Sequence, residues 1–208
     1  MMNRGLIFGV IAMATIVVAS NILVQFLLGD WLTWGAFTYP FAFLVTDLMN
    51  RRFGVLQARK VVLAGFVVGV ASSLVGTQVM LEFGPAVSLR IALGSGTAFL
   101  LAQLTDVLVF DKLRAGSWWK APLVSSFIGS MLDTLLFFSL AFAGAFIFLD
   151  PSQPNGWARE VIPMFGIGPE APLWVSLALA DFAVKLSLAL VALGPYRVAI
   201  RRFMPARA

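Results

Sequence analysis

Six long apolar segments, separated by short polar loops, constrain this chain more than any other feature. They cover about residues 6–28, 36–53, 60–81, 89–113, 121–149 and 172–200 of the 208. Most reach the roughly 20 residues that a helix needs to cross a bilayer. The chain is 60% hydrophobic and 12% charged, whereas a soluble domain is about 25% charged. The sequence therefore predicts an all-α polytopic membrane protein, a six-transmembrane-helix bundle forming one domain over residues 1–208.

Two of these segments need comment. The second is short and contains Pro40, which interrupts the hydrogen-bond ladder of a helix, so a kinked or partly re-entrant helix is expected there. The first could be mistaken for a signal peptide. It is too long, contains Asn21 and Gln25, and is followed by no small-residue cleavage site, so it is expected to be a retained helix.

Basic residues predict the orientation of the bundle. If the six segments cross alternately, twelve of the 15 Lys and Arg residues fall on one side. They are Arg4, Arg51, Arg52, Arg59, Lys60, Lys112, Arg114, Lys120, Arg197, Arg201, Arg202 and Arg207. Cytoplasmic loops are enriched in such residues, so both termini are expected in the cytoplasm. The net charge of +5 is assigned to these loops, and no nucleic-acid partner is expected.

The composition excludes several kinds of chemistry. The chain has no cysteine and no histidine, which rules out disulfides, thiol chemistry, histidine metal sites, Ser-His triads and haem ligation. It also has no Gly-rich Walker loop, so it is not itself an ATPase. An intramembrane enzyme using two aspartates, such as Asp106 and Asp133, is conceivable, but the Gly-x-Gly-Asp motif of such proteases is absent. We therefore expect no enzyme, no metal and no cofactor.

Five ionisable residues lie inside the apolar segments. They are Asp47, Asp106, Asp133, Asp181 and Lys185. Charge at that depth is costly and therefore rare, and it usually faces the interior of the bundle and serves a function. These residues predict that the protein handles a polar solute within the lipid bilayer.

The spacing of polar residues assigns some of them to shared helix faces. In the fifth segment, Ser126, Ser130 and Asp133 recur at spacings of three and four, so they share a face near the bilayer midplane. In the sixth segment, Asp181 and Lys185 form an i,i+4 pair. Such a pair either neutralises itself and fixes helix packing or belongs to a substrate or proton pathway.

Other polar and aromatic residues leave alternatives open. Asn21 and Gln25, also i,i+4, either bond between helices or line a cavity. Trp31, Trp34 and Tyr39 are expected in an aromatic belt at the membrane surface. Trp34 and Phe37 could also form a stacking platform for a planar ligand. Separately, Asp47 and Arg51 are spaced as an ion pair at the cytoplasmic boundary. The loop over residues 150–171 is a cap over an outward-facing pocket or a simple connector.

Small residues mark faces of close helix packing. The third segment has Gly65, Gly69 and Gly76, and the fourth has a row of small residues that ends at Asp106. Such rows let helix backbones approach closely in lipid. Tight packing within the bundle is the expected role, although the face on the third segment could also support a homodimer.

Several stretches of the chain resemble the queuosine precursor transporters, which belong to the vitamin uptake transporter group. The matching residues include Ser20-Asn21, Thr33-Trp34-Gly35-Ala36-Phe37, Pro40-Phe41, Thr46-Asp47-Leu48, Arg52-Phe53-Gly54, Ala102-Gln103, Asp106-Val107, Trp118-Trp119, Ala121-Pro122, Ser125, Gly129, Asp133-Thr134, Asp181 and Lys185. The chain departs from several family members at Arg51, where they carry an acidic residue, and in its longer loop before the last helix.

The resemblance implies a bacterial inner-membrane importer of 7-deazaguanine bases, such as 7-cyano-7-deazaguanine, for queuosine synthesis in tRNA. It also implies a six-helix fold similar to the substrate-binding subunits of energy-coupling-factor transporters, working without their ATPase. Two alternatives stay open: a membrane-embedded binding subunit of a larger complex, and a transporter of another vitamin or nucleobase-like solute.

The chemistry of such a base suggests roles for the polar residues. The base presents a ring N–H and an exocyclic amine side by side, which a carboxylate can accept. Asp133 is the first candidate for that acceptor, with Asp47 and Asp106 as second choices. Donors for the base carbonyl could come from Asn21, Gln25, Gln103 or Lys185, and Ser130 lies on the Asp133 face. Asp106, Asp181 and Lys185 are candidates for coupling or gating. Asp106 or the Asp181–Lys185 pair could carry a proton, but facilitated diffusion trapped by downstream enzymes is equally consistent with the sequence.

Overall fold

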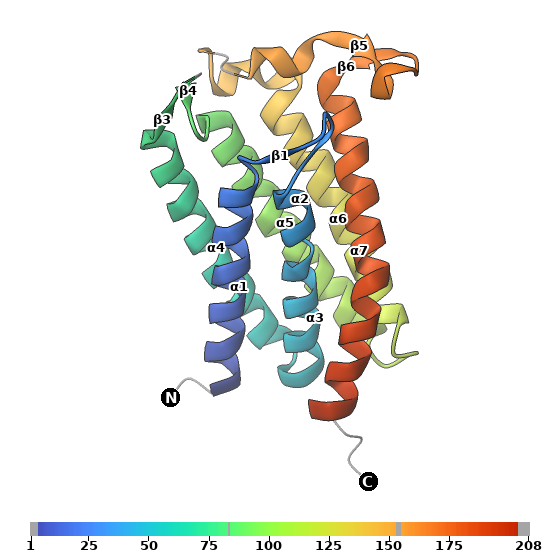
Figure 1. Cartoon of the computed structure of the whole chain (residues 1–208). Coiled ribbons are helices and arrows are strands. Elements are labelled where there is room, and N and C mark those ends of the chain that lie inside the picture. The colour runs from blue at the N-terminus through green and yellow to red at the C-terminus, as the bar shows by residue number, and fades with distance from the viewer. Residues whose placement is uncertain (1–3, 83, 153–154, 204–208) are drawn as a thin grey trace.

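The computed structural model describes residues 4–82, 84–152 and 155–203, which form an elongated bundle of helices (Figure 1). The long helices are α1 (Arg4–Leu23), α4 (Val55–Gln78), α5 (Leu89–Leu113), α6 (Lys120–Phe142) and α7 (Leu173–Phe203). Two shorter helices, α2 (Gly35–Thr38) and α3 (Phe41–Phe53), come between α1 and α4 in the sequence.

Short hairpins and turns cover one end of the bundle (Figure 1). The described residues form three antiparallel pairs: β1 (Leu27–Leu28) with β2 (Leu32–Thr33), β3 (Met80–Leu81) with β4 (Gly84–Pro85), and β5 (Val161–Pro163) with β6 (Glu170–Pro172). The 3-10 helices η1 (Gly144–Leu149), η2 (Gly156–Arg159) and η3 (Met164–Gly166) lie in the same region. The opposite end carries most of the basic residues.

The long helices expose apolar side chains and bury charged ones, as is typical of a membrane protein. Five of them are long and apolar enough to cross a bilayer. Large apolar side chains such as Phe8, Val67 and Val191 are exposed on their outer faces, while Asp106 and Lys185 are buried inside. Soluble proteins rarely expose apolar surface on this scale. The chain is therefore an all-α polytopic membrane protein, with strands confined to the connections.

The second apolar segment forms two short helices, so it does not supply a sixth long one. α2 ends at Thr38 and α3 begins at Phe41, with Tyr39 and Pro40 between them. The 13 residues of α3 rise about 20 Å, which is less than the hydrocarbon thickness. The interruption expected at Pro40 is confirmed, and the interrupted helix lies inside the bundle against α1, α4, α5 and α7.

Three helix ends differ most from those expected. α1 ends at Leu23, short of residue 28, because the chain turns into a hairpin through Gly29, whose φ of 67° favours glycine. α4 begins at Val55, earlier than residue 60, directly after Gly54 with φ 84°. α6 ends at Phe142, short of residue 149, where Arg90 binds carbonyl groups at its C-terminus.

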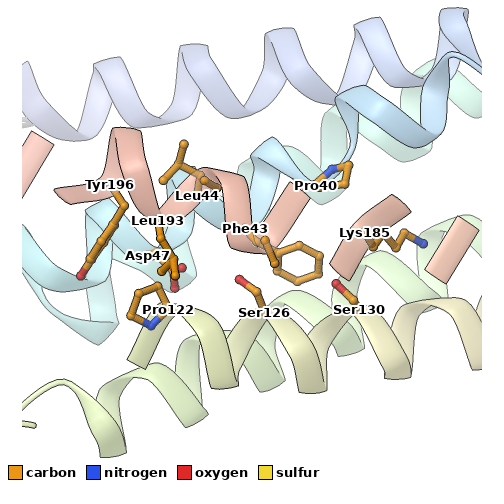
Figure 2. A pocket seen from close by; sticks show the side chains of 12 residues that line it. Pro40, Phe43, Leu44, Asp47, Pro122, Ser126, Ser130, Lys185, Leu193 and Tyr196 are labelled. Carbon is orange, nitrogen blue, oxygen red and sulfur yellow. The ribbon is translucent and has the colours of Figure 1, made fainter. Parts of the chain in front are cut away.

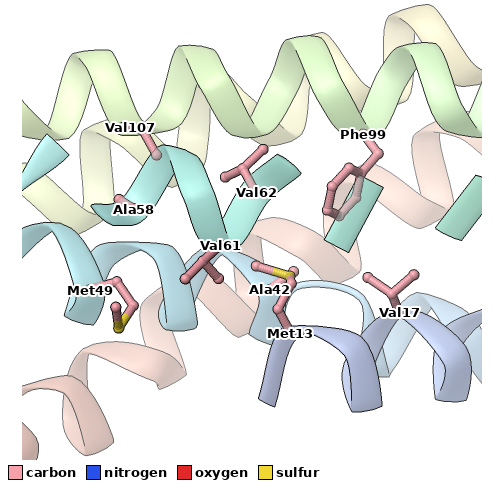
Figure 3. Close-up of a cluster of buried hydrophobic side chains, with 9 residues drawn as sticks. All are labelled: Met13, Val17, Ala42, Met49, Ala58, Val61, Val62, Phe99 and Val107. Atoms are coloured by element: carbon pink, nitrogen blue, oxygen red, sulfur yellow. The ribbon is translucent and has the colours of Figure 1, made fainter. Parts of the chain in front are cut away.

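Four helices share an apolar core, shown in Figure 3. Its buried members are Met13, Val17, Ala42, Met49, Ala58, Val61, Val62, Phe99 and Val107. A Cβ atom on Gly65 would lie 2.5 Å from Met13 Cγ, and one on Gly76 would lie 2.6 Å from Val87 Cγ2. The small-residue face of α4 therefore packs inside the chain, as expected, and gives no support to a dimer through that face.

The loop over residues 150–171 folds back over the hairpin end. The β5–β6 pair closes it, and the Phe165 ring meets the Trp31 ring edge-on at 5.5 Å. None of its described residues lines the two cavities presented below. Whether it caps an outward-facing pocket stays a prediction. Arg207, counted with the basic residues above, lies outside the described residues.

Candidate functional site

A buried lysine lies at the centre of a hydrogen-bonded network between α6 and α7. Lys185 Nζ donates to Asp133 Oδ2 at 2.6 Å, to Thr134 Oγ1 at 3.3 Å and to Asp181 Oδ2. Thr134 Oγ1 lies 3.0 Å from Asp181 Oδ2 and donates to it. The three hydrogens of the ammonium group thus meet three acceptors. Such pairing is how charged side chains are accommodated inside a membrane.

Tyr39 joins this network from the interruption between α2 and α3. Its hydroxyl donates to Asp133 Oδ1 at 2.9 Å, so both oxygens of Asp133 are engaged. The Tyr39 ring packs edge-on against Phe43 and Phe99, and Lys185 Nζ lies 5.4 Å from its centre. Interrupted helices supply the ligands of many transporters, and here the interruption brings a side chain to the buried charges.

A cavity extends from this network toward the basic end of the bundle, between α3, α6 and α7. Its lining consists of Pro40, Phe43, Leu44, Asp47, Pro122, Ser126, Ser130, Lys185, Ala189, Ala192, Leu193 and Tyr196. In Figure 2, Lys185 lies at one end and Asp47 and Tyr196 lie toward the other. Ser126 and Ser130 on α6 lie between them, near the Phe43 ring. We call this space the α3–α7 cavity.

The α3–α7 cavity is closed to organic solutes in this structure. Its volume is about 20 Å³, and a cavity needs roughly 10–15 Å³ to hold a single water molecule. Sites that bind small organic molecules are larger by about an order of magnitude. A bicyclic solute could therefore occupy this space only after the surrounding helices move apart.

A second cavity lies on the other side of Tyr39, between α1, α4 and α5. Its lining consists of Val17, Ser20, Asn21, Tyr39, Phe66, Gly69, Val70, Ser73, Ser95, Gly96 and Phe99, and its volume is about 40 Å³. Asn21 Nδ2 lies 3.5 Å from the Gly69 carbonyl oxygen. Tyr39 therefore lies between the two cavities, with its hydroxyl on the charged network.

Two more carboxylates lie near the basic end of the α3–α7 cavity. Asp47 lines the cavity, and its Oδ1 accepts from Ser125 Oγ at 3.3 Å. Asp106 is fully buried behind it, with Oδ2 3.3 Å from Thr46 Oγ1. Neither Asp47 nor Asp106 forms an ion pair with another described residue.

The expected ion pair between Asp47 and Arg51 is wrong. Arg51 Nε donates to Tyr196 Oη at 2.9 Å, and Nη1 donates to the Arg114 carbonyl oxygen at 2.5 Å. The guanidinium group also lies 5.5 Å from the centre of the Phe110 ring. Although the two residues are one turn apart on α3, Arg51 reaches α5 and α7 while Asp47 faces α6.

The structure brings together about half of the residues predicted to bind or couple. Asp133, Asp181 and Lys185 form one network, while Asp47 and Ser130 line the adjoining cavity. The i,i+4 pair on α7 is thus a bridge to α6 as well as a local pair.

The other predicted residues lie elsewhere. Asn21 lines the second cavity, and Gln25 donates to the Ala86 carbonyl oxygen in an exposed position. Trp34 and Phe37 pack against each other at 6.1 Å and line neither cavity. Gln103 is fully buried, and its Oε1 lies 3.1 Å from Thr46 Oγ1.

Sequence reasoning missed three residues of the site. Tyr39 was grouped with the aromatic belt, and Thr134 and Tyr196 received no role. The position of Tyr39 next to Pro40 is the one local signal that could have assigned it to the interior. Among the described residues, no three acidic side chains gather as a metal site would require.

Comparison with known proteins identifies relatives of one kind. A family model described as putative vitamin uptake transporter matches residues 33–199. The queuosine precursor transporter of Escherichia coli is 34% identical over 191 residues, covering 85% of this chain and 77% of that protein. The probable queuosine precursor transporter of Haemophilus influenzae is 40% identical over 139 residues, covering 61% and 57%. That of Bacillus subtilis is 26% identical over 198 residues, covering 86% and 76%. No solved structure matches.

Proposed function

The chain belongs to the putative vitamin uptake transporter family, and we propose that it imports 7-deazaguanine precursors of queuosine across the bacterial inner membrane. The names of its relatives support the class of solute. The observation that carries the proposal to this chain is the α3–α7 cavity. It presents carboxylate, ammonium, hydroxyl and aromatic groups inside an apolar bundle. A transporter, and not an enzyme, is what the family indicates.

A single domain with six crossings and cytoplasmic termini fits the arrangement of the helices. α1 begins and α7 ends at the same end of the bundle (Figure 1), which requires an even number of crossings. The five long helices give an odd number, so α2 and α3 together serve as the remaining crossing. The excess of basic residues at that end supports a cytoplasmic location.

Asp47 is the acceptor for the amine edge of the base. Both oxygens of Asp133, the first candidate from the sequence, already accept hydrogen bonds from Tyr39 and Lys185. Asp47, by contrast, lines the cavity and has one long bond, from Ser125. Asp133 then serves to hold Lys185 and Tyr39 in place.

The rest of the cavity suits the remaining parts of the base. Ser126 and Ser130 can donate to the carbonyl oxygen. The rings of Phe43 and Tyr196 can pack against the flat faces, and such stacking contributes about 1–3 kcal/mol per base. A buried donor and acceptor set also discriminates strongly, because an analogue that lacks the amine leaves the carboxylate unpaired.

Rescue of queuosine in tRNA tests the proposal. A bacterium that lacks both base synthesis and its own importer would express this gene and receive nanomolar 7-cyano-7-deazaguanine. We expect the wild type to restore queuosine and Asp47→Asn to fail while present in the membrane. Asp30→Asn, in an exposed turn, is the matched control and should behave as the wild type. Absence of rescue by membrane-inserted wild type would contradict the proposal. It would favour a vitamin solute, as the family description suggests.

A further inference from the structure

Asp47 and Asp106 form a buried pair of carboxylates without a cation. Asp106 is 0% exposed and Asp47 is 2% exposed. Ser125 Oγ donates to Asp47 Oδ1 at 3.3 Å, and Oγ1 of Thr46, the residue before Asp47, lies 3.3 Å from Asp106 Oδ2. Cβ of Asp106 lies against Gly129 of α6. Two ionised carboxylates buried in the same region of the bundle would repel each other in a medium of low dielectric constant. One proton held between them removes that repulsion.

The charged groups around the pair are engaged elsewhere. On α3, Arg51 binds Tyr196 and the Arg114 carbonyl group. On α6 and α7, Asp133 and Lys185 bind each other. α4 meets α3 through apolar side chains of the shared core, such as Val61. No described cation is therefore in place to neutralise Asp106.

The hydrogen bonds of Thr46 indicate that Asp106 carries the proton, on the Oδ2 atom that faces Thr46 Oγ1. Thr46 Oγ1 has one hydrogen but lies within bonding distance of four acceptors. They are the carbonyl oxygens of Ala42 at 3.2 Å and Phe43 at 2.9 Å, Gln103 Oε1 at 3.1 Å and Asp106 Oδ2 at 3.3 Å. The hydroxyl can donate to only one of them, and the Phe43 carbonyl is the nearest. Asp106 Oδ1 has no hydrogen-bond partner among the residues that the structure describes.

An ionised Asp106 would thus be a buried charge whose one donor among the described residues, the Thr46 hydroxyl, also lies within reach of three other acceptors. A protonated Asp106 instead supplies the missing hydrogen, because its O–H can donate to the lone pairs of Thr46 Oγ1. Buried polar groups are nearly always hydrogen-bonded, and an unpaired buried charge is the costlier alternative. The contact between Asp106 and Thr46 is therefore satisfied in the neutral form and unsatisfied in the ionised form.

We propose that Asp106 holds a proton that accompanies each molecule of base bound to Asp47, so that import is coupled to protons. This rests on the proposed function of the α3–α7 cavity. With the proton on Asp106, Asp47 is ionised and free to accept the amine edge. When the base leaves toward the cytoplasm, the proton passes from the carboxyl group of Asp106 to the vacated carboxylate of Asp47. Asp47 then releases it to water in the cavity.

The test uses purified protein in liposomes with radiolabelled 7-cyano-7-deazaguanine. With the outside acidic, wild type should accumulate the base above equilibrium and lose that accumulation with a protonophore. Asp106→Asn mimics the neutral carboxyl group, so it should keep downhill exchange, lose accumulation and bind the base independently of pH. Asp111→Asn, on the same helix but paired with Arg114, should match the wild type. Accumulation by Asp106→Asn, or an unchanged pH profile, would overturn the proposal.

A second variant reports on the proton through the direction of a shift. Thr46→Val keeps the shape of the side chain and removes the hydroxyl group whose oxygen accepts from neutral Asp106. The proton should then be held more weakly, so the midpoint of the pH dependence of base binding should lie at a lower pH than in the wild type. If Thr46 instead donated to an ionised Asp106, the midpoint would move to higher pH, and the proposal would be wrong.

Infrared spectroscopy separates this inference from the identity of the solute. Without any base, wild-type protein at neutral pH should show the carbonyl band of a protonated carboxyl group, and Asp106→Asn should lack it. A band present in the wild type would support the proton site even if no deazaguanine bound. Equal spectra for the two proteins would overturn the proton site whatever the solute is.

Discussion

Arg51 and Tyr196 join α3 to α7 through a hydrogen bond of 2.9 Å, from Nε to the phenol oxygen, at the basic end of the α3–α7 cavity. Tyr196 is fully buried and meets the Phe110 ring edge-on at 6.4 Å. The same guanidinium group binds the Arg114 carbonyl oxygen of α5. One side chain thus ties α3, α7 and the C-terminus of α5 together, and the proposed transport requires these elements to separate.

Removing this hydrogen bond should favour opening at the basic end. Tyr196→Phe keeps the ring and deletes the oxygen that accepts from Arg51. A hydrogen bond to a charged group contributes about 1.5–3 kcal/mol, so the open form should become about tenfold more populated or more. Since the chain has no cysteine, a single Ala192→Cys in the cavity wall reports on opening. Its rate of labelling by a thiol reagent from the cytoplasmic side should rise about tenfold.

The control for this experiment is Val191→Cys, which is 68% exposed on the outer face of α7. Its labelling should not change with Tyr196→Phe. Equal rates for Ala192→Cys in both backgrounds would mean that the contact between Arg51 and Tyr196 does not hold the cavity closed.

The network around Lys185 predicts an asymmetry between its charges. Lys185→Met leaves Asp133 and Asp181 buried without a cation, and breaking such a pair costs roughly 3–5 kcal/mol. Asp133→Asn or Asp181→Asn instead leaves one acid with one lysine. We therefore expect little Lys185→Met protein in the membrane, and near-normal amounts of either asparagine variant.

Uptake should separate the Asp133→Asn variant from the wild type. Asp133 holds both Tyr39 and Lys185, so Asp133→Asn should abolish uptake although the protein is inserted. The measurement is uptake normalised to the amount of membrane protein. Normal uptake by Asp133→Asn would show that transport does not need the carboxylate of Asp133.

A glycine on α6 sets the space between Asp106 and the aromatic wall of the cavity. A Cβ atom on Gly129 would lie 2.7 Å from Phe43 Cε1 and 3.3 Å from Asp106 Cβ. Gly129→Ala should therefore displace the Phe43 ring and reduce uptake at least several-fold. Gly194→Ala, where a Cβ atom meets nothing within 4 Å, is the control and should transport normally. Full activity of Gly129→Ala would mean that the Phe43 ring can shift without harm.

Much of this arrangement could be predicted from the sequence, and the missing parts have a common physical cause. Hydropathy located the apolar segments, and Pro40 marked the interruption in the second. The spacing of Asp133, Asp181 and Lys185 indicated inward-facing charges. Partners across helices could not be predicted, because they depend on how each helix is rotated about its axis. Spacing alone paired Arg51 with Asp47, but the rotation of α3 directs Arg51 to Tyr196. Tyr39 reaches Asp133 for the same reason.

A buried arginine at the hairpin end should matter for stability and not for transport. Arg90 is 1% exposed and donates to the carbonyl oxygens of Leu140, at 2.8 Å, and Ala143 at the C-terminus of α6. Positive charge at a helix C-terminus is favourable, and the planar guanidinium group can bind two carbonyl groups at once.

Arg90→Ala should destabilise the protein by about 2 kcal/mol or more, and Arg90→Lys should be intermediate. Thermal unfolding in detergent measures this, with exposed Lys112→Ala on the same helix as the unchanged control. Uptake per folded molecule should stay near that of the wild type in all three variants. A loss of uptake without a loss of stability would place Arg90 in the path of the solute.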